Sequence, residues 1–283
     1  MPQRSNPTAR QVRLGAELRK MRERAGLTAR EAAAALGSNH MMLSHQEAGR
    51  AGISEQRVCR LAEIYACEDE LLVNALSAMA KERGKRWWQA YRGRIASSFL
   101  DVAELEHHAT YIRTYQVAHI PGLFQTEEYM RAVFALSAPQ LTDAERELQI
   151  EHRLQRQQLI EPEARVPQEA IIHEAALRMR FGGRKAARAQ LDRVLELAHR
   201  DNISVRVVTY DAEGFAGLGS PVMYAGGAVP QLDTVELDAL HGVLFLDAEA
   251  QLTWYSILFD RMADVALTVE ASHDFIHRLA QQT

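Results

Sequence analysis

The feature that most constrains the fold of this chain is a series of short helical segments between residues 14 and 61, each bounded by a capping residue or a glycine. Leu14, Leu18 and Met21 recur at the spacing i, i+4, i+7, which predicts a first helix with one apolar face. Gly26 follows where that helix is expected to end. The pattern predicts a compact unit made of short helices joined by tight turns.

Two of these segments have the arrangement of a helix-turn-helix pair. Thr28, three residues before a glutamate in capping-box register, is placed to cap a helix over residues 29–36, and Asn39 is placed to cap the next, over residues 40–47. Two short helices joined by a glycine-containing turn can place the second of them in the major groove of DNA. Leu43 is expected to be the buried anchor of that second helix.

The outward side chains of the second helix are the predicted base-reading residues, because polar groups can hydrogen-bond to base edges and a methionine can contact a thymine methyl. Four further residues, at cap positions or with positive charge, are expected to hold phosphates and to set register rather than sequence. The predicted base-reading residues are His40, Met41, Ser44 and His45, and the predicted phosphate contacts are Thr28, Arg30, Asn39 and Arg50. The alternative is a helical cluster that never meets DNA.

This segment resembles the Xre type of helix-turn-helix, the phage-repressor-like family. The matching positions are Leu27, Thr28, Glu31, Ala33, Leu36, Gly37, Ser44, Glu47 and Gly49. Two residues depart from the family pattern: Ser38 stands where an apolar residue is usual, and Gln46 replaces a common aliphatic residue. Both are expected to weaken the packing of the recognition helix.

Length and charge indicate two domains with different partners. At 283 residues the chain is longer than one typical domain. Residues 1–95 hold 17 basic and 10 acidic side chains, a net charge of +7, whereas the remainder holds 16 and 27, a net charge of −11. A basic N-terminal part is typical of a module that faces phosphates. We expect a DNA-binding domain of about five helices at 1–80, a linker at 81–100 and a regulatory and interaction domain at 101–283.

The second part of the chain predicts a domain of helices and a small, mostly antiparallel sheet, which makes the protein α+β. Residues 104–118, 142–160 and 184–200 have helical patterns, whereas residues 203–210 are rich in β-branched side chains and predict a strand. Three further candidate strands and two closing helices follow. The basic and aromatic linker could track DNA, but the preferred interpretation is that its aromatic residues dock it onto the domain that follows.

Several segments of this second domain resemble the C-terminal domain of the WhiJ-like, antitoxin-like transcriptional regulators of actinobacteria. They are Trp87-Trp88, Ile120 to Thr126 with Tyr129, His173 to Arg178, Gly182-Gly183, Gln190-Leu191 and Val205 to Tyr210. The resemblance implies a regulator of development or specialised metabolism. It also implies a small protein partner that binds this domain and antagonises DNA binding.

The sequence lacks the patterns of several other functions. Cys59 and Cys67 form no CxxC pair, the histidines lack metal-ligand spacing, and Ser220 lacks the surroundings of an esterase nucleophile. We therefore expect no enzymatic activity, no cofactor and no metal. The chain has no apolar run long enough to cross a bilayer and begins without an apolar signal segment, so we expect a cytoplasmic protein that associates with the nucleoid when bound to DNA.

Together these observations predict a sequence-specific transcriptional regulator that binds double-stranded operator DNA, as a homodimeric repressor controlled through its C-terminal domain. That control has two candidate sources, a small protein partner or a small-molecule ligand. For the ligand, a pocket is expected between the sheet and the helices, lined by Tyr210, Phe215, Trp254 and Tyr255. A third alternative, that the protein is the antitoxin of a toxin-antitoxin pair, rests on the family resemblance.

Overall fold

The computed structural model describes residues 6–82, 84, 86–161, 163–164, 166–214, 219–239 and 242–283. The chain forms two compact units, Met1–Ala90 and Tyr91–Thr283. Phe215, which was expected to line a ligand pocket, lies outside the described residues.

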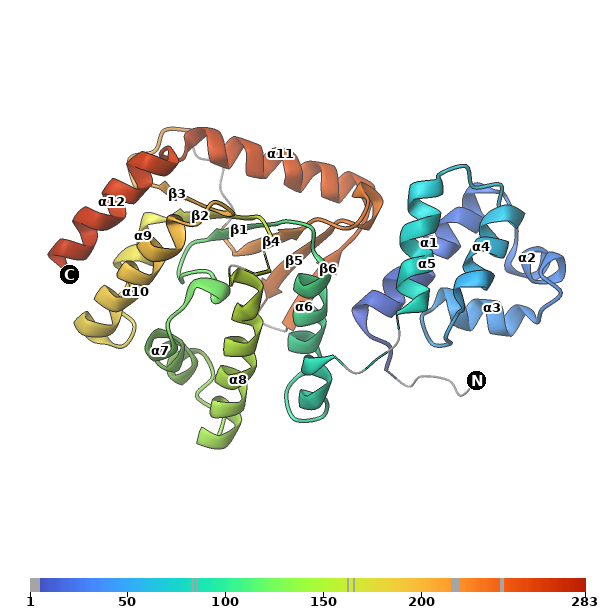
Figure 1. Ribbon diagram of the computed structural model, residues 1–283, viewed down its shortest axis with the longest axis horizontal. Coiled ribbons are helices and arrows are strands. Elements are labelled where there is room, and N and C mark those ends of the chain that lie inside the picture. The colour runs from blue at the N-terminus through green and yellow to red at the C-terminus, as the bar shows by residue number, and fades with distance from the viewer. Residues whose placement is uncertain are drawn as a thin grey trace. The chain divides into compact units, whose positions relative to one another are not determined.

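The described part of the N-terminal unit is entirely helical, as the sequence predicts (Figure 1). Its core is formed by apolar side chains that recur at helical spacing, among them Leu18, Leu43, Leu61 and Leu76, all fully buried. Its helices are α1 (Ala9–Arg24), α2 (Ala29–Ala35), α3 (His40–Glu47), α4 (Glu55–Ile64) and α5 (Glu70–Lys81), followed by the short 3-10 helix η1 (Trp87–Tyr91).

The described part of the C-terminal unit combines helices with one mixed sheet, so the α+β prediction is confirmed. Its helices are α6 (Ser97–His108), η2 (Gly122–Phe124), α7 (Glu127–Ser137), α8 (Asp143–Arg156), η3 (Gln157–Ile160), α9 (Glu174–Arg178), α10 (Gly183–Ala198), η4 (Pro230–Leu232), α11 (Glu249–Val265) and α12 (Val269–Gln282). Its strands are β1 (Ile112–Gln116), β2 (Gln168–His173), β3 (Ile203–Val208), β4 (Val222–Ala225), β5 (Thr234–Ala239) and β6 (Gly242–Leu246).

The strands lie in the order β3-β2-β1-β4-β5-β6, with β1 near the middle. Strand β1 pairs parallel with β2, which pairs parallel with β3, whereas the β1–β4, β4–β5 and β5–β6 pairings are antiparallel.

The predicted helix over residues 104–118 is wrong in its second half, because α6 ends at His108 and β1 begins at Ile112. Ile112 and Tyr115 are almost fully buried on a strand paired on both sides, and this tertiary environment overrides the local helical pattern.

Helices cover both faces of the sheet (Figure 1). On one face, Leu258, Phe259 and Met262 of α11 pack against a cluster that includes Tyr115 and Val235. The opposite face is covered by apolar side chains of α6, α7, α9 and α10, while α12 packs against α10 and β3. Alternate residues of β2 therefore belong to different cores, as expected for a strand buried on both sides.

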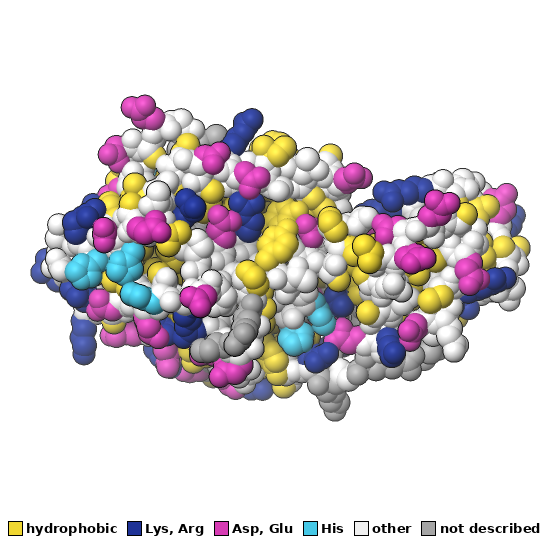
Figure 2. All heavy atoms as spheres, turned by 45° about the horizontal axis from the view of Figure 1, so that its top comes forward, with side chains coloured by type: hydrophobic (Ala, Val, Ile, Leu, Met, Phe, Trp, Pro, Cys, Tyr) yellow, Lys and Arg dark blue, Asp and Glu magenta, His cyan; other side chains and the backbone are white. Residues whose placement is uncertain are grey.

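Several apolar side chains remain on the surface of the C-terminal unit. Figure 2 shows hydrophobic side chains gathered in a patch among interspersed acidic and basic ones. Two side chains expected to line a pocket are largely exposed, Tyr210 at 65% and Trp254 at 52%, whereas Tyr255 is half-buried against the α11 core. Tyr210 and Trp254 therefore face solvent.

Every helix in the described part of the chain is too short or too polar to span a bilayer.

Candidate nucleic-acid interface

Helix α3 presents one face to the core and the other to solvent. Leu43 is fully buried, as predicted, and Gln46 and Glu47 are also buried. His40, Met41 and Ser44 are exposed, while His45 is half-buried. An exposed polar face of this kind, on the second helix of the pair, is what a major-groove reader presents to base edges.

A buried ion pair fixes α3 against α1. The Arg22 guanidinium donates to both carboxylate oxygens of Glu47, with Nε–Oε1 at 2.7 Å and Nη2–Oε2 at 2.9 Å. Arg22 Nη1 also donates to the carbonyl oxygen of Leu27, at 2.7 Å, in the turn before α2. One side chain of α1 thus holds both the start of α2 and the end of α3. The contribution of Arg22 was not predicted, because 25 residues separate it from Glu47.

Two glycines allow α1 and α3 to approach closely. A Cβ atom on Gly15 would lie 2.4 Å from the carbonyl oxygen of Glu47, so no larger residue fits without moving the backbone of α3. Gly49 ends α3 with φ of +71°, a conformation that favours glycine, and its own Cβ would lie 2.8 Å from the carbonyl oxygen of Gln11. The position of the recognition helix therefore depends on backbone contacts as well as on the ion pair.

The two departures from the Xre pattern both take part in hydrogen bonds. Ser38 Oγ accepts from Arg57 Nη2 at 2.7 Å, which connects the turn before α3 to α4. The buried Gln46 donates through Nε2 to the carbonyl oxygen of Gly52 at 3.1 Å, which holds the loop after α3. Gln46 Oε1 is buried without a hydrogen-bond partner among the described residues, so the expectation that the two departures weaken the packing stays a prediction.

The predicted phosphate contacts lie at the ends of the two helices. Thr28 caps α2, and its amide and hydroxyl both donate to the Glu31 carboxylate, so its donors are already used within the capping box. Asn39 caps α3 by accepting from the amide of Met41 at 2.8 Å, which leaves its NH₂ group facing solvent. Arg30 and Arg50 are exposed, and neither guanidinium has an ion-pair partner among the described residues.

A second group of charged residues lies in the C-terminal unit, between α6, α8 and the sheet. Arg156 of α8 donates to both oxygens of Glu106 of α6, with Nε–Oε2 at 2.7 Å and Nη2–Oε1 at 2.5 Å, and both side chains are buried. Burial, together with repulsion from Arg156 and Arg153, lowers the pKa of His152 to about 3, so this imidazole is neutral at pH 7. No group of described residues has the composition of a metal site.

Glu236 of β5 belongs to the same group and is half-buried. Burial, with repulsion from Asp238, raises its pKa to about 8 from an ordinary value of 4.5, despite the opposing effect of Arg156. Between about pH 4.5 and 8, the folded protein keeps a proton on Glu236 that the unfolded chain has already released. The free energy of unfolding therefore falls as the pH rises through this range.

We expect Glu236→Gln to stabilise the C-terminal unit by about 2–4 kcal/mol at pH 8.5 and to change little at pH 5, because glutamine resembles the protonated acid. Hydrogen exchange of the amides of β4 and β5 at both pH values measures this effect. Glu249→Gln, an exposed carboxylate at the start of α11, is the matched control. An equal effect of Glu236→Gln at pH 5 and 8.5 would contradict the assigned titration.

The comparisons with known proteins match two parts of the chain to two different families. Residues 13–76 match a family described as a helix-turn-helix domain, and residues 99–278 match a family described as a domain of unknown function, DUF5753. The comparisons with curated proteins and with solved structures found no match. Because the second match covers more than half of the chain, the protein belongs to the DUF5753 family, with a helix-turn-helix domain ahead of the family domain.

Proposed function

We propose that this protein is a sequence-specific transcriptional regulator, not an enzyme, that binds operator DNA as a homodimer and represses the genes it controls. The observation that carries the proposal is the helix-turn-helix unit itself, in which the Arg22–Glu47 pair holds α3 with its polar face exposed. Each protomer places α3 in a major groove, and the two half-sites lie about one helical turn apart.

In this proposal the exposed side chains of the unit divide the work of recognition. His40, Met41, Ser44 and His45 read bases. Arg30, Arg50 and the Asn39 amide contact phosphates, whereas the donors of Thr28, also expected to contact a phosphate, are taken up by the Glu31 carboxylate. The absence of described ion-pair partners for Arg30 and Arg50 supports this assignment, because no protein carboxylate competes with DNA for them.

We expect His45→Ala and Arg50→Ala to weaken DNA binding in different ways. Loss of a base contact should cost about 1–3 kcal/mol at one operator position and relax the preference there. Loss of a phosphate contact should weaken binding to all sequences alike. It should also reduce, by about one, the slope of the logarithm of the binding constant against the logarithm of the salt concentration. Affinities for a panel of singly substituted operators, measured at several salt concentrations, separate the two effects.

The operator sequence for this panel is obtained by mapping where the tagged protein binds across the genome. The proposal predicts a few sharp binding peaks that share an inverted repeat. Arg188→Ala removes an exposed arginine of α10 in the other unit and is the matched control, expected to bind as the unaltered protein does. Equal and uniform losses for His45→Ala and Arg50→Ala would contradict the division of roles. An absence of peaks would contradict the proposed function.

We assign dimerisation and control to the C-terminal unit, which receives a small protein partner. The WhiJ-like resemblance supports this, as do the exposed apolar side chains of Leu244, Trp254 and Ile257 on the unit's surface.

The test is purification of the tagged full chain from its native cells, with Trp254→Ser as the comparison. A small second polypeptide that is lost in the variant supports partner control. Toxicity of that polypeptide when expressed alone would favour the antitoxin alternative.

A further inference from the structure

The two edges of the sheet in the C-terminal unit differ in whether the rest of the chain covers them. Strands β3 and β6 are the edge strands. At the β3 edge, the carbonyl oxygen of Val207 accepts from the amide of Leu267 at 2.9 Å, and the amide of Val207 donates to Ser272 Oγ, also at 2.9 Å. The segment that leads into α12 therefore occupies hydrogen-bonding groups of this edge.

Strand β6 has no such cover among the described residues, where it pairs with β5 alone. In an edge strand the amides and carbonyl oxygens of alternate residues point away from the sheet, where they can pair with another strand. Proteins commonly protect such an edge with a charged side chain, a proline or a bulge. Gly242–Leu246 contains no charged residue and no proline, and it pairs with β5 in continuous register. Leu244, at its centre, is 54% exposed.

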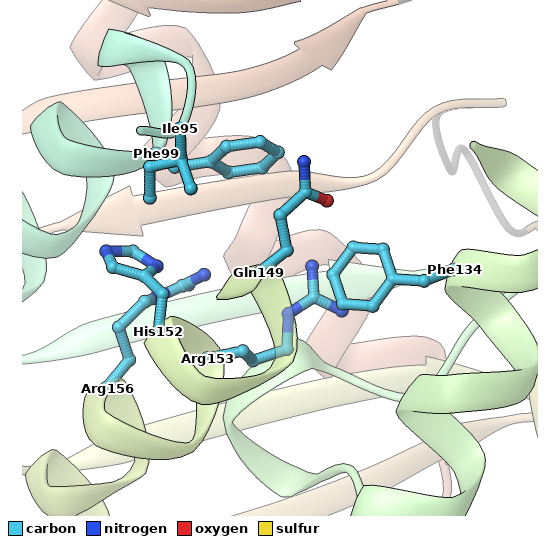
Figure 3. Close-up of a pocket in the computed structure, with 7 residues that line it drawn as sticks. All are labelled: Ile95, Phe99, Phe134, Gln149, His152, Arg153 and Arg156. Atoms are coloured by element: carbon cyan, nitrogen blue, oxygen red, sulfur yellow. The ribbon is translucent and has the colours of Figure 1, made fainter. Parts of the chain in front are cut away.

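The two faces of the sheet offer a partner less than this edge does. Helix α11 covers one face. On the opposite side, Figure 3 shows Ile95 and Phe99 on one side of a narrow space and the side chains of α8 on the other. The described residues that line this space leave no room in it for even one water molecule. The backbone of β6 is therefore the part of the sheet that is open to a partner.

The charge of the unit indicates that this partner is a second copy of the chain. Residues 96–283 carry a net charge of −11, so two copies repel each other over much of their surfaces. Two copies therefore meet most favourably along a segment without charge, and β6 is such a segment. A basic partner would instead be attracted to the acidic surface, away from β6.

We propose that two copies of the chain dimerise by antiparallel pairing of β6 with β6, which joins their two sheets. A two-fold axis at the centre of the strand places Leu244 of each copy opposite Leu244 of the other, and Val243 opposite Phe245. Apolar and aromatic pairs of this kind stabilise antiparallel strands. This inference rests on the homodimer of the proposed function and names its surface. The exposed Trp254 and Ile257 of α11 remain for the small protein partner.

The first test is light scattering of the purified full chain, without DNA, as it leaves a size-exclusion column. We expect a mass twice the 31.8 kDa of one chain. A chain that stays monomeric at all concentrations tested overturns the inference.

Leu244→Lys should raise the dissociation constant of the dimer by about tenfold or more, because it places two ammonium groups opposite each other across the two-fold axis. Leu136→Lys is the matched control, since it adds the same charge at a leucine of α7 that is 70% exposed, and it should dimerise as the unaltered chain does. An unchanged dissociation constant in Leu244→Lys overturns the β6 interface.

A mixture of two variants separates loss of the interface from failure to fold. Leu244→Glu should also be monomeric, whereas an equimolar mixture of Leu244→Lys and Leu244→Glu should form a dimer with one chain of each, because opposite charges then face each other. Failure of the mixture to form this dimer overturns the pairing of β6 with itself.

These outcomes are distinguishable from failure of the proposed function. A dimer that survives Leu244→Lys places the interface on another surface and leaves the proposed function intact. A monomeric unaltered chain removes the homodimer from both proposals, while the genome-wide binding peaks test DNA recognition separately.

Discussion

Glu47→Ala is expected to lower the free energy of unfolding of the helix-turn-helix unit by about 3–5 kcal/mol and to remove specific DNA binding with it. The substitution leaves the Arg22 guanidinium in a buried site, where it is only 7% exposed, without the carboxylate that accepts two of its hydrogen bonds. Because Glu47 is the last residue of α3, the end of that helix also loses its ion pair to α1 and keeps only the backbone contacts at Gly15 and Gly49.

Hydrogen exchange of the amides of α1 and α3 in the full chain measures this loss separately from the stability of the C-terminal unit. Glu63→Ala is the matched control, since Glu63 pairs with Arg60 on the surface of the same unit, and a surface pair contributes about 0–1 kcal/mol. The double variant Arg22→Met, Glu47→Leu should recover much of the stability, because it removes the uncompensated charge. A loss below about 1 kcal/mol for Glu47→Ala would show that the ion pair does not hold α3.

Glu106→Ala is expected to destabilise the C-terminal unit by a similar amount, about 3–5 kcal/mol. Glu106 is 1% exposed and accepts both hydrogen bonds from Arg156, which lies one turn from Arg153 on α8. Without Glu106 the two arginines would repel each other in a poorly solvated site, with no described carboxylate paired to either.

Protection of the amides of α6 and α8 against hydrogen exchange reports this change. Glu106→Gln separates charge from packing, because it fills the same space without the negative charge and should still cost most of the stability. The control is Glu127→Ala, whose carboxylate pairs with Arg131 at 2.7 Å on the exposed surface of α7. If Glu106→Gln is as stable as the unaltered protein, packing rather than charge holds α6 to α8.

Local signals in the sequence were sufficient for most of the helices. The capping residues Thr28, Asn39, Thr126 and Thr142 each accept a hydrogen bond from an amide two or three residues further on, so the start of each helix is set by neighbours in the chain. Strands β3 to β6 were also predicted, because their β-branched and apolar residues are bounded by turn residues. The helix-turn-helix unit combines such signals over about 50 residues, which is why its fold could be predicted from the sequence.

The arrangements that define the candidate sites could not be predicted, because they join residues far apart in the chain. Nothing near Arg22 indicates Glu47, and nothing near Ser38 indicates Arg57. Glu106 and its partner Arg156 are 50 residues apart, and two side chains expected to line a ligand pocket, Tyr210 and Trp254, are exposed on the surface.

Strand β1 shows the same distinction between local and long-range information. Its sequence is compatible with a helix, and its burial between β2 and β4 decides that it is a strand. The amino-acid sequence by itself thus determined which short segments are helices and that one of them has the character of a DNA-reading helix, since caps and periodicity act within a few residues. Only the tertiary structure decided how that helix is held, which strands pair in parallel and that Arg156 of α8 pairs with Glu106 of α6, because these depend on contacts closed across long loops.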